Sequence, residues 1–209
     1  MKTCYIFCAG GFDRLAEPIG AGDYVLAADG GLMHTQALGL VPDGIIGDFD
    51  SLGYVPEGAQ VFPVEKDDTD SMLAVRKGLE LGCRRFVLYG AMDGPRLDHT
   101  LANLQTLCFL AEHGAVGYLV GLSHTATAVR EETVRFAPEA AGILSVFCLG
   151  ADAIVTLRGL RYELNRDVLQ SSFPLGVSNH FIKKPAGITV HSGTVVALWD
   201  TANGLPAGR

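Results

Sequence analysis

The chain has 209 residues, of which 48% are hydrophobic, and its formal net charge at pH 7 is −7. An acidic chain lacks the basic face that nucleic-acid backbones require, and no apolar run approaches the roughly 20 residues of a membrane helix. We therefore expect a cytoplasmic protein that binds neither nucleic acid nor a membrane. The five cysteines are scattered through apolar runs without metal-binding spacing, so buried free thiols are expected.

Short apolar runs alternate with helical patterns in the first part of the chain. Strands are expected at 3–9, 24–28, 45–46, 61–64, 85–89 and 118–120, and helices at 31–40, 70–82 and 97–112. In the second helix the expected core face carries Met72, Val75 and Leu79. The core stripe expected in the third consists of Leu97, Leu101, Leu104, Cys108 and Ala111. Strands that alternate with helices predict an α/β fold with a doubly wound, mostly parallel sheet.

The pattern changes after about Gly121, where no helical period remains. Short β-rich segments follow at 143–149, 153–157, 160–163, 188–191 and 194–199, and 191–193 is the expected hairpin turn between the last two. We expect an α/β domain at 1–123, a small antiparallel β domain at 124–200 and a loose tail at 201–209.

Acidic residues are concentrated between Asp43 and Asp70. This stretch holds eight acidic side chains and one basic one, Lys66, so its local balance of −7 equals the net charge of the whole chain. Carboxylates this close together repel one another unless water or a cation compensates them. A solvated acidic loop is the simplest interpretation, and a metal site is the alternative.

The positions of three aspartates favour the metal site. Asp48 and Asp50 flank Phe49 directly after the apolar run 44–47, and Asp70 opens the second helix. In α/β sheets, metal and phosphate chemistry gathers where strands end and helices begin. Mg²⁺ prefers such hard oxygen ligands and leaves positions for substrate phosphates. The pattern predicts a magnesium–phosphate site.

Two further loops are candidates for ligand binding in this domain. Asp29-Gly30-Gly31 lets backbone approach a ligand closely, although such a turn is equally often structural. Arg96 lies at a strand-to-helix junction, where its guanidinium can bind phosphate oxygens. Asp98 either has a role in the site or stabilises the helix start, and His99 is either functional or a surface residue. Lys66 either pairs with a carboxylate or reaches a phosphate.

A polar cluster also lies in the β part of the chain. Ser178 and Asn179 either form a turn or supply hydrogen bonds to a heteroaromatic ring, with Phe181 or Trp199 as nearby apolar surface.

With these motifs in order, the chain resembles the thiamine pyrophosphokinase (thiamine diphosphokinase) family. The matching motifs are Ala28-Asp-Gly-Gly31, Gly47-Asp-Phe-Asp-Ser51, Lys66-Asp-Asp-Thr-Asp70, Arg96-Leu-Asp-His99 with Asn103, and Ser178-Asn179-x-Phe181. They run in the family's order and span nearly the whole chain. The chain departs from the family pattern at Pro95, where glycine is common, and at His180, where glutamate is common.

The resemblance implies transfer of pyrophosphate from ATP to the hydroxyethyl group of thiamine, giving thiamine diphosphate and AMP. It implies an α/β domain followed by an antiparallel β-sandwich, and a homodimer with active sites shared between chains. By the family pattern Mg²⁺ is held by Asp48, Asp50 and Asp70. The implied nucleotide-binding residues are Asp29, Gly30, Gly31, Lys66, Thr69, Arg96 and His99. Arg96 and Asp98 are the expected catalytic residues, and Ser178, Asn179 and Phe181 the expected thiamine-binding residues.

Two other functions compete with this one. The first is a pyrophosphokinase that acts on another heterocyclic alcohol, such as a pterin. The second is a non-catalytic module that senses a nucleotide or thiamine. The three aspartates count against the sensor, because sensing does not require three carboxylates on a metal.

Overall fold

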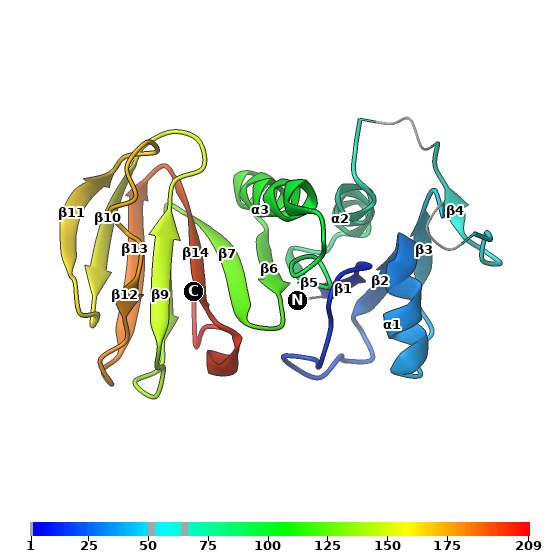
Figure 1. Ribbon diagram of the computed structural model, residues 1–209, viewed down its shortest axis with the longest axis horizontal. Helices are drawn as coiled ribbons and strands as arrows, with labels where there is room; N and C mark the ends of the chain where they lie inside the picture. The colour runs from blue at the N-terminus through cyan, green and yellow to red at the C-terminus, as the bar shows by residue number, and fades with distance from the viewer. Residues whose placement is uncertain (1, 50–52, 64–66) are drawn as a thin grey trace. The chain divides into compact units, whose positions relative to one another are not determined.

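The computed structural model of the chain describes residues 2–49, 53–63 and 67–209 (Figure 1). The chain folds into two compact units. The first contains the chain up to Thr106 together with Gly114–Leu122, and the second contains Leu107–His113 and Ser123–Arg209. After His113 the chain returns to the first unit and leaves it at Leu122, next to the end of the predicted 1–123 domain.

The first unit is built on parallel strands, whose order in the sheet is β6-β5-β1-β2-β3-β4. Every pair of neighbouring strands in this order is parallel, and β1 lies between β2 and β5. Because the strands are parallel, all of their carboxyl ends lie at one edge of the sheet. The strands are β1 (Thr3–Phe7), β2 (Tyr24–Ala28), β3 (Gly44–Gly47), β4 (Gln60–Val61), β5 (Arg85–Tyr89) and β6 (Val116–Val120).

The helices of this unit begin and end close to the predicted positions. A short 3₁₀ turn η1 (Asp29–Gly31) leads into α1 (Leu32–Ala37); α2 spans Asp70–Glu80 and α3 spans Leu97–Glu112. The chain moves along the sheet in one direction through α1 and in the other through α2 and α3. Right-handed crossovers therefore predict helices on both faces of the sheet. The burial of all five residues of β1 agrees with this.

The buried faces of two helices differ from the expected ones. In α3 the buried residues include Asn103, Thr106, Leu107 and Leu110, whereas the expected core residues Leu97 and Leu101 are 70% and 52% exposed. The apolar spacing of three and four residues predicted a different face of α3 from the one that is buried. The buried face contains polar residues, so apolar spacing alone did not identify it. These polar residues tolerate burial because they are hydrogen-bonded: Thr106 Oγ1 donates to the carbonyl of Ala102 at 3.0 Å.

In α2, Val75 is buried as expected, but Met72 and Leu79 are only partly covered. The buried face is formed by Ser71, Ala74, Val75 and Gly78. A Cβ atom added to Gly78 would lie 2.5 Å from Cε1 of Phe86 on β5. Small residues therefore allow this helix to approach the sheet closely, which an apolar-periodicity argument cannot detect.

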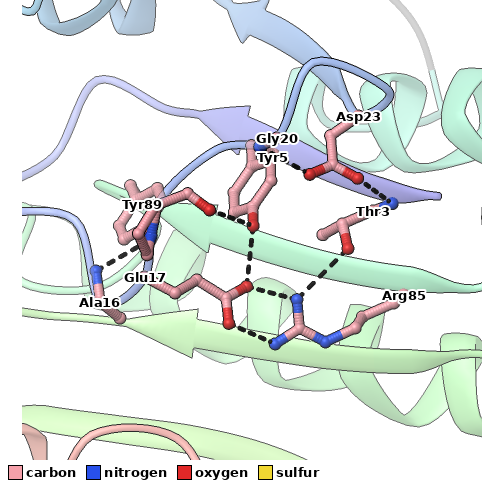
Figure 2. Close-up of polar contacts among 9 residues, drawn as sticks. Thr3, Tyr5, Ala16, Glu17, Gly20, Asp23, Arg85 and Tyr89 are labelled. Atoms are coloured by element: carbon pink, nitrogen blue, oxygen red, sulfur yellow. Dashed lines mark hydrogen bonds and ion pairs between the residues drawn. The ribbon is translucent and has the colours of Figure 1, made fainter. Parts of the chain in front are cut away.

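The connection from β1 to β2 contains no helix and is anchored by polar contacts (Figure 2). Glu17 forms a bidentate ion pair with Arg85 of β5, in which Nη2 lies 2.8 Å from Oε2, and it accepts a hydrogen bond from the Tyr5 hydroxyl at 2.8 Å. The Tyr89 hydroxyl accepts a hydrogen bond from the Ala16 amide. Burial, together with the bond to Glu17, raises the pKa of Tyr5. This network fixes an irregular segment against the sheet.

The second unit contains antiparallel strands that belong to two different sheets, in agreement with the β-sandwich that the resemblance implies. Their orders are β12-β9-β14-β7 and β11-β10-β13-β8. The Phe136 ring of β8 lies 5.2 Å from the rings of both Phe181 and Trp199, so aromatic contacts link the two sheets. The strands are β7 (His124–Arg130), β8 (Thr133–Phe136), β9 (Ile143–Phe147), β10 (Ala153–Arg158), β11 (Leu164–Leu169), β12 (Asn179–His180), β13 (Ala186–Ser192) and β14 (Thr194–Asp200).

The predicted hairpin at 191–193 is wrong. β13 pairs with β10 and β8, whereas β14 pairs with β7 and β9, so the chain changes sheets at Gly193. Gly193 has a φ of +84°, and an added Cβ would lie 2.9 Å from the carbonyl oxygen of Asp152. A tight glycine turn between two β segments fits both a hairpin and a corner between sheets, and only the pairing distinguishes them.

Other parts of this unit also differ from expectation. Strands β7, β8, β11 and β12 were not predicted. The segment 160–163 is not a strand and makes only an isolated bridge from Leu160 to Phe181. The expected loose tail is packed: the Ala207 amide donates to the carbonyl of Arg135, and the Arg209 side chain reaches Glu132 and the carbonyl of Ala128.

The five cysteines are free thiols, as expected, and three of them are buried. Among the described residues no helix is long and apolar enough to span a membrane.

Candidate active site

A cavity of about 430 Å³ lies at the carboxyl edge of the parallel sheet. Its walls come from the segments that follow β1, β2, β3 and β5 and from the first turns of α2 and α3. The lining residues are Cys8, Ala9, Gly10, Ala28, Asp29, Asp48, Thr69, Asp70, Ser71, Gly90, Ala91, Met92, Gly94, Pro95, Arg96, His99, Thr100 and Asn103. Segments distant in sequence therefore meet at one place, as the parallel topology requires.

Close contacts between main chains hold together the segments that follow β1, β2 and β5. The Cys8 amide donates to the carbonyl of Tyr89, and the Gly10 amide donates to the carbonyl of Gly90, both at 2.8 Å. A Cβ atom on Gly10 would lie 2.5 Å from the Gly90 carbonyl oxygen, and one on Gly31 would overlap the carbonyl of Phe7. Gly31 therefore permits backbone to approach backbone, a role that sequence reasoning did not assign to it.

The predicted site residues of the Asp29 loop lie in different environments. Asp29 lines the cavity and has a φ of +47°, a conformation that is uncommon outside glycine. Gly30 and Gly31 are buried beside it and do not belong to the lining. Their predicted contact with a nucleotide stays a prediction.

Carboxylates give the cavity its electrostatic character. Asp48 and Asp70, two of the three predicted metal ligands, line it together with Asp29. Asp50 and Lys66 lie outside the described residues. Among the residues that the structure does describe, no group of three or more His, Cys, Asp or Glu side chains is arranged to hold a metal ion. Burial, reinforced by the charge of Asp70, raises the pKa of the Cys8 thiol to about 12.

Hydrogen-bonded side chains connect the two helix starts that face the cavity. Thr69 caps α2, since its Oγ1 accepts the Met72 amide at 3.2 Å, and it lies 3.0 Å from Ser71 Oγ. Ser71 donates to Oδ1 of Asn103 at 2.6 Å, and Nδ2 of Asn103 donates to the carbonyl of Ala91 at 2.7 Å. From the sequence, Asn103 was named only as part of the motif that contains Arg96 and His99 and was given no role of its own.

The two predicted catalytic residues pair with each other. Nη2 of Arg96 lies 2.6 Å from Oδ2 of Asp98, and both side chains are largely exposed. The Arg96 guanidinium is the main cause of a lowered pKa of the Asp98 carboxyl. Arg96 and His99 line the cavity, whereas Asp98 is not one of the lining residues. Asp98 is therefore held as a carboxylate at the margin of the site.

The predicted thiamine-binding residues belong to the second unit and differ strongly in exposure. Ser178 is exposed, with a φ of +59°, and its amide donates to Oγ of Ser145. Asn179 is buried; its Oδ1 accepts the amide of Tyr162, and its Nδ2 donates to the carbonyl of the same residue.

The aromatic residues proposed as nearby apolar surface are also buried. Phe181 is only 8% exposed and packs on Phe136, and Trp199 is 1% exposed with its Nε1 donating to the carbonyl of Gly204. Asn179 and Phe181 thus have structural roles in this fold, and their contact with thiamine remains a prediction.

Two models of known protein families match the sequence of this chain. The model of the thiamin pyrophosphokinase catalytic domain matches residues 16–116, and that of the thiamin pyrophosphokinase vitamin B1 binding domain matches residues 131–195. The first match contains most of the cavity lining, and the two matches follow one another in the order of the two units. The chain belongs to the thiamine pyrophosphokinase family. It is therefore an enzyme of thiamine pyrophosphorylation.

Solved structures of this family share the fold. The thiamine pyrophosphokinase of Bacillus subtilis superposes with a TM-score of 0.83 at 21% identity, covering 95% of this chain and 99% of that one. A thiamin pyrophosphokinase family protein of Enterococcus faecalis gives 0.79 at 25% identity, with 96% and 99% covered. The yeast enzyme gives 0.73 at 14% identity, with 98% and 88% covered. A search of curated protein sequences finds no match.

Proposed function

We propose that the enzyme transfers the pyrophosphoryl group of ATP to the hydroxyethyl group of thiamine, giving thiamine diphosphate and AMP. One observation carries this proposal: Asp48, Asp70 and Arg96 line one cavity at the carboxyl edge of a parallel sheet. Oxygen ligands for a cation and a guanidinium for phosphate thus meet at one place. Phosphoryl-type transfer depends mainly on positioning and on neutralising charge, which such a site provides.

The donor set fits Mg²⁺. Asp48 and Asp70 contribute hard carboxylate oxygens to the cavity, and Asp50 is proposed as the third ligand. A bound Mg²⁺ would neutralise phosphate charge and polarise the bond to be broken. Arg96 is proposed to bind phosphate oxygens, together with Lys66 and His99.

Asp98 is proposed to orient the attacking hydroxyl group rather than to remove its proton. Arg96 lowers the pKa of this carboxyl, and a carboxylate with a lowered pKa is a weak base at neutral pH. A group that stays ionised can still accept a hydrogen bond from the substrate hydroxyl and hold its oxygen toward the phosphorus atom.

The acceptor side of the site is proposed to lie near Ser178, which is the exposed member of the predicted thiamine-binding set. The match to a vitamin B1 binding domain supports this assignment. We further propose, from the family resemblance, a homodimer with active sites shared between chains and a cytoplasmic location.

A direct assay tests the reaction. Purified enzyme is incubated with ATP, Mg²⁺ and thiamine, and the products are identified by mass. We expect AMP and thiamine diphosphate in equal amounts, with ADP absent, and loss of both when EDTA is added. The Asp70→Asn variant should lose activity by orders of magnitude while keeping its fold, because it removes a carboxylate from the cavity.

The same assay separates the competing functions. Turnover of a pterin alcohol in place of thiamine would identify a different acceptor. Binding of ATP or thiamine without any product would identify a sensing module. Near-normal turnover by Asp70→Asn, or in the presence of EDTA, would contradict the proposed magnesium site.

A further inference from the structure

The hydrogen bonds that link α2 to α3 have only one possible direction. The fixed point is the carbonyl oxygen of Ala91, which can only accept. The Asn103 side-chain atom 2.7 Å from it must therefore be Nδ2, the donor. It follows that Oδ1, the acceptor, faces Ser71 at 2.6 Å.

This assignment also determines the direction of the hydrogen on the hydroxyl groups of Ser71 and Thr69. A serine hydroxyl has one hydrogen, and Ser71 donates it to Asn103. The contact of 3.0 Å between Thr69 Oγ1 and Ser71 Oγ is then a hydrogen bond only if Thr69 donates. Thr69 Oγ1 also accepts the Met72 amide at 3.2 Å. Its single hydrogen is used, and one of its lone pairs is left.

These hydrogen bonds determine whether the Thr69 hydroxyl group can donate or accept a hydrogen bond when a ligand binds. Thr69 lines the cavity together with its neighbour Asp70 and with Asp29 and Asp48. With its hydrogen directed to Ser71, the Thr69 hydroxyl group presents an acceptor to the cavity and has no hydrogen left for a phosphate oxygen. An oxygen acceptor among carboxylates suits a divalent cation, or a water molecule bound to one.

We propose that Asn103 is a positioning residue that orients this chain of hydroxyl groups, so that Thr69 adds an oxygen acceptor to the cation-binding side of the cavity. This inference rests on the proposed function. It assigns Thr69 to the cation rather than to the phosphates, with which the family resemblance had grouped it. Groups that orient metal ligands typically change metal affinity by about 10–100-fold when they are removed.

The test compares cation binding with nucleotide binding. Mn²⁺ serves as the probe and is titrated into the enzyme while free Mn²⁺ is followed by electron paramagnetic resonance. ATP affinity is measured separately by calorimetry in EDTA. The variants are Thr69→Val, which keeps the shape of the side chain without the oxygen, and Asn103→Leu, which removes both ends of the link. Ser71→Ala breaks the series of hydrogen bonds between Thr69 and Asn103 at its middle residue. It replaces Asn103→Leu in the test if that variant does not fold.

Two further variants act as controls. Thr106→Val makes the same substitution at a buried α3 threonine that is hydrogen-bonded to Ala102 and does not line the cavity. Thr69→Ser retains the hydroxyl group and should bind Mn²⁺ as tightly as the unmodified enzyme does. Thermal unfolding of each variant shows how much stability is lost with the helix cap.

We expect Thr69→Val, Asn103→Leu and Ser71→Ala to weaken Mn²⁺ binding by about tenfold or more while metal-free ATP binding is unchanged. Excess Mg²⁺ should restore turnover in Asn103→Leu. Weaker ATP binding with unchanged Mn²⁺ binding would overturn the proposal, because Thr69 would then be a phosphate donor. Unchanged affinity for both, or absence of Mn²⁺ binding by the unmodified enzyme, would also overturn it.

Product formation by the unmodified enzyme, measured in parallel, separates this inference from the proposed function. If thiamine diphosphate forms but the variants bind Mn²⁺ normally, the role of Asn103 is wrong and the proposed function stands. If no thiamine diphosphate forms, the proposed function itself fails.

Discussion

At the scale of single residues, the ion pair between Arg96 and Asp98 controls the charge of a proposed catalytic group. Asp98 and Arg96 form an exposed ion pair, and Arg96 is the main cause of the lowered pKa of Asp98. A carboxyl with a lowered pKa stays ionised as the pH falls, until that lowered value is reached. Loss of activity near neutral pH should therefore not arise from protonation of Asp98.

Replacement of Arg96 tests this directly. In Arg96→Gln the pKa of Asp98 should rise toward the ordinary value of about 3.9, because the neighbouring cation is gone. The carboxyl carbon resonance of Asp98, followed by NMR as the pH is lowered, reports the change. The same titration midpoint in both proteins would show that the ion pair is absent in solution.

Ser178 and Asn179 are adjacent but should respond differently to the same substitution. Ser178→Ala should raise KM for thiamine more than KM for ATP and leave the thermal midpoint unchanged, because the side chain is exposed. Asn179→Ala should lower stability by about 1–3 kcal/mol, since it leaves the amide and carbonyl of Tyr162 without their partner. Steady-state kinetics and thermal unfolding separate the two effects. A stable Asn179→Ala variant with a raised KM for thiamine would assign Asn179 to the substrate instead.

At the scale of elements, helix starts and strand ends are positioned by contacts that lie away from the cavity. The irregular β1–β2 connection carries Gly10 at one end, and the Glu17–Arg85 ion pair anchors its middle to β5 (Figure 2). Both side chains are about three-quarters covered, so water screens this pair less than it screens a surface pair.

Neutralising one partner should therefore destabilise the fold. Glu17→Gln weakens the bonds to Arg85 and Tyr5, and we expect a loss of about 1.5–3 kcal/mol. The matched control is Glu80→Gln, which removes an exposed pair with Lys77 at 3.8 Å and should change stability by at most about 0.5 kcal/mol. Urea unfolding of both variants checks the difference. Equal losses would show that burial does not strengthen the Glu17 pair.

At the scale of the whole molecule, the proposed cation and acceptor residues belong to different units. Asp70 lies in the first unit and Ser178 in the second. If two chains share their sites, as the family resemblance implies, two different inactive chains can complement each other. A heterodimer then has both defects in one site and an intact second site.

Co-expression of Asp70→Asn with Ser178→Trp tests this. Ser178→Trp places a bulky ring at the proposed thiamine site and should be inactive alone. We expect the mixture to recover part of the activity, in proportion to the heterodimer fraction measured by native mass spectrometry. Confirmed heterodimers that remain inactive would mean that each site is formed within one chain.

The sequence by itself determined the architecture of the first unit and the edge of its sheet at which several predicted site residues gather. Apolar runs alternating with helical periods specify a parallel sheet, and parallel strands end at one edge. For this reason Asp29, Asp48, Asp70 and Arg96 line one cavity, although they follow different strands. The bounds of α3 and β5 followed from the same periodicity.

Only the tertiary structure decided how these elements meet. The spacing of apolar residues identifies the apolar face of a helix or strand but not the element against which that face packs. For this reason the exposure of Leu97 and the change of sheet at Gly193 were not foreseen. The close approach at Gly31, the buried amide of Asn179 and the chain of hydrogen bonds through Asn103 depend on atoms from distant segments. Local sequence does not record such contacts, because they form when the segments pack together.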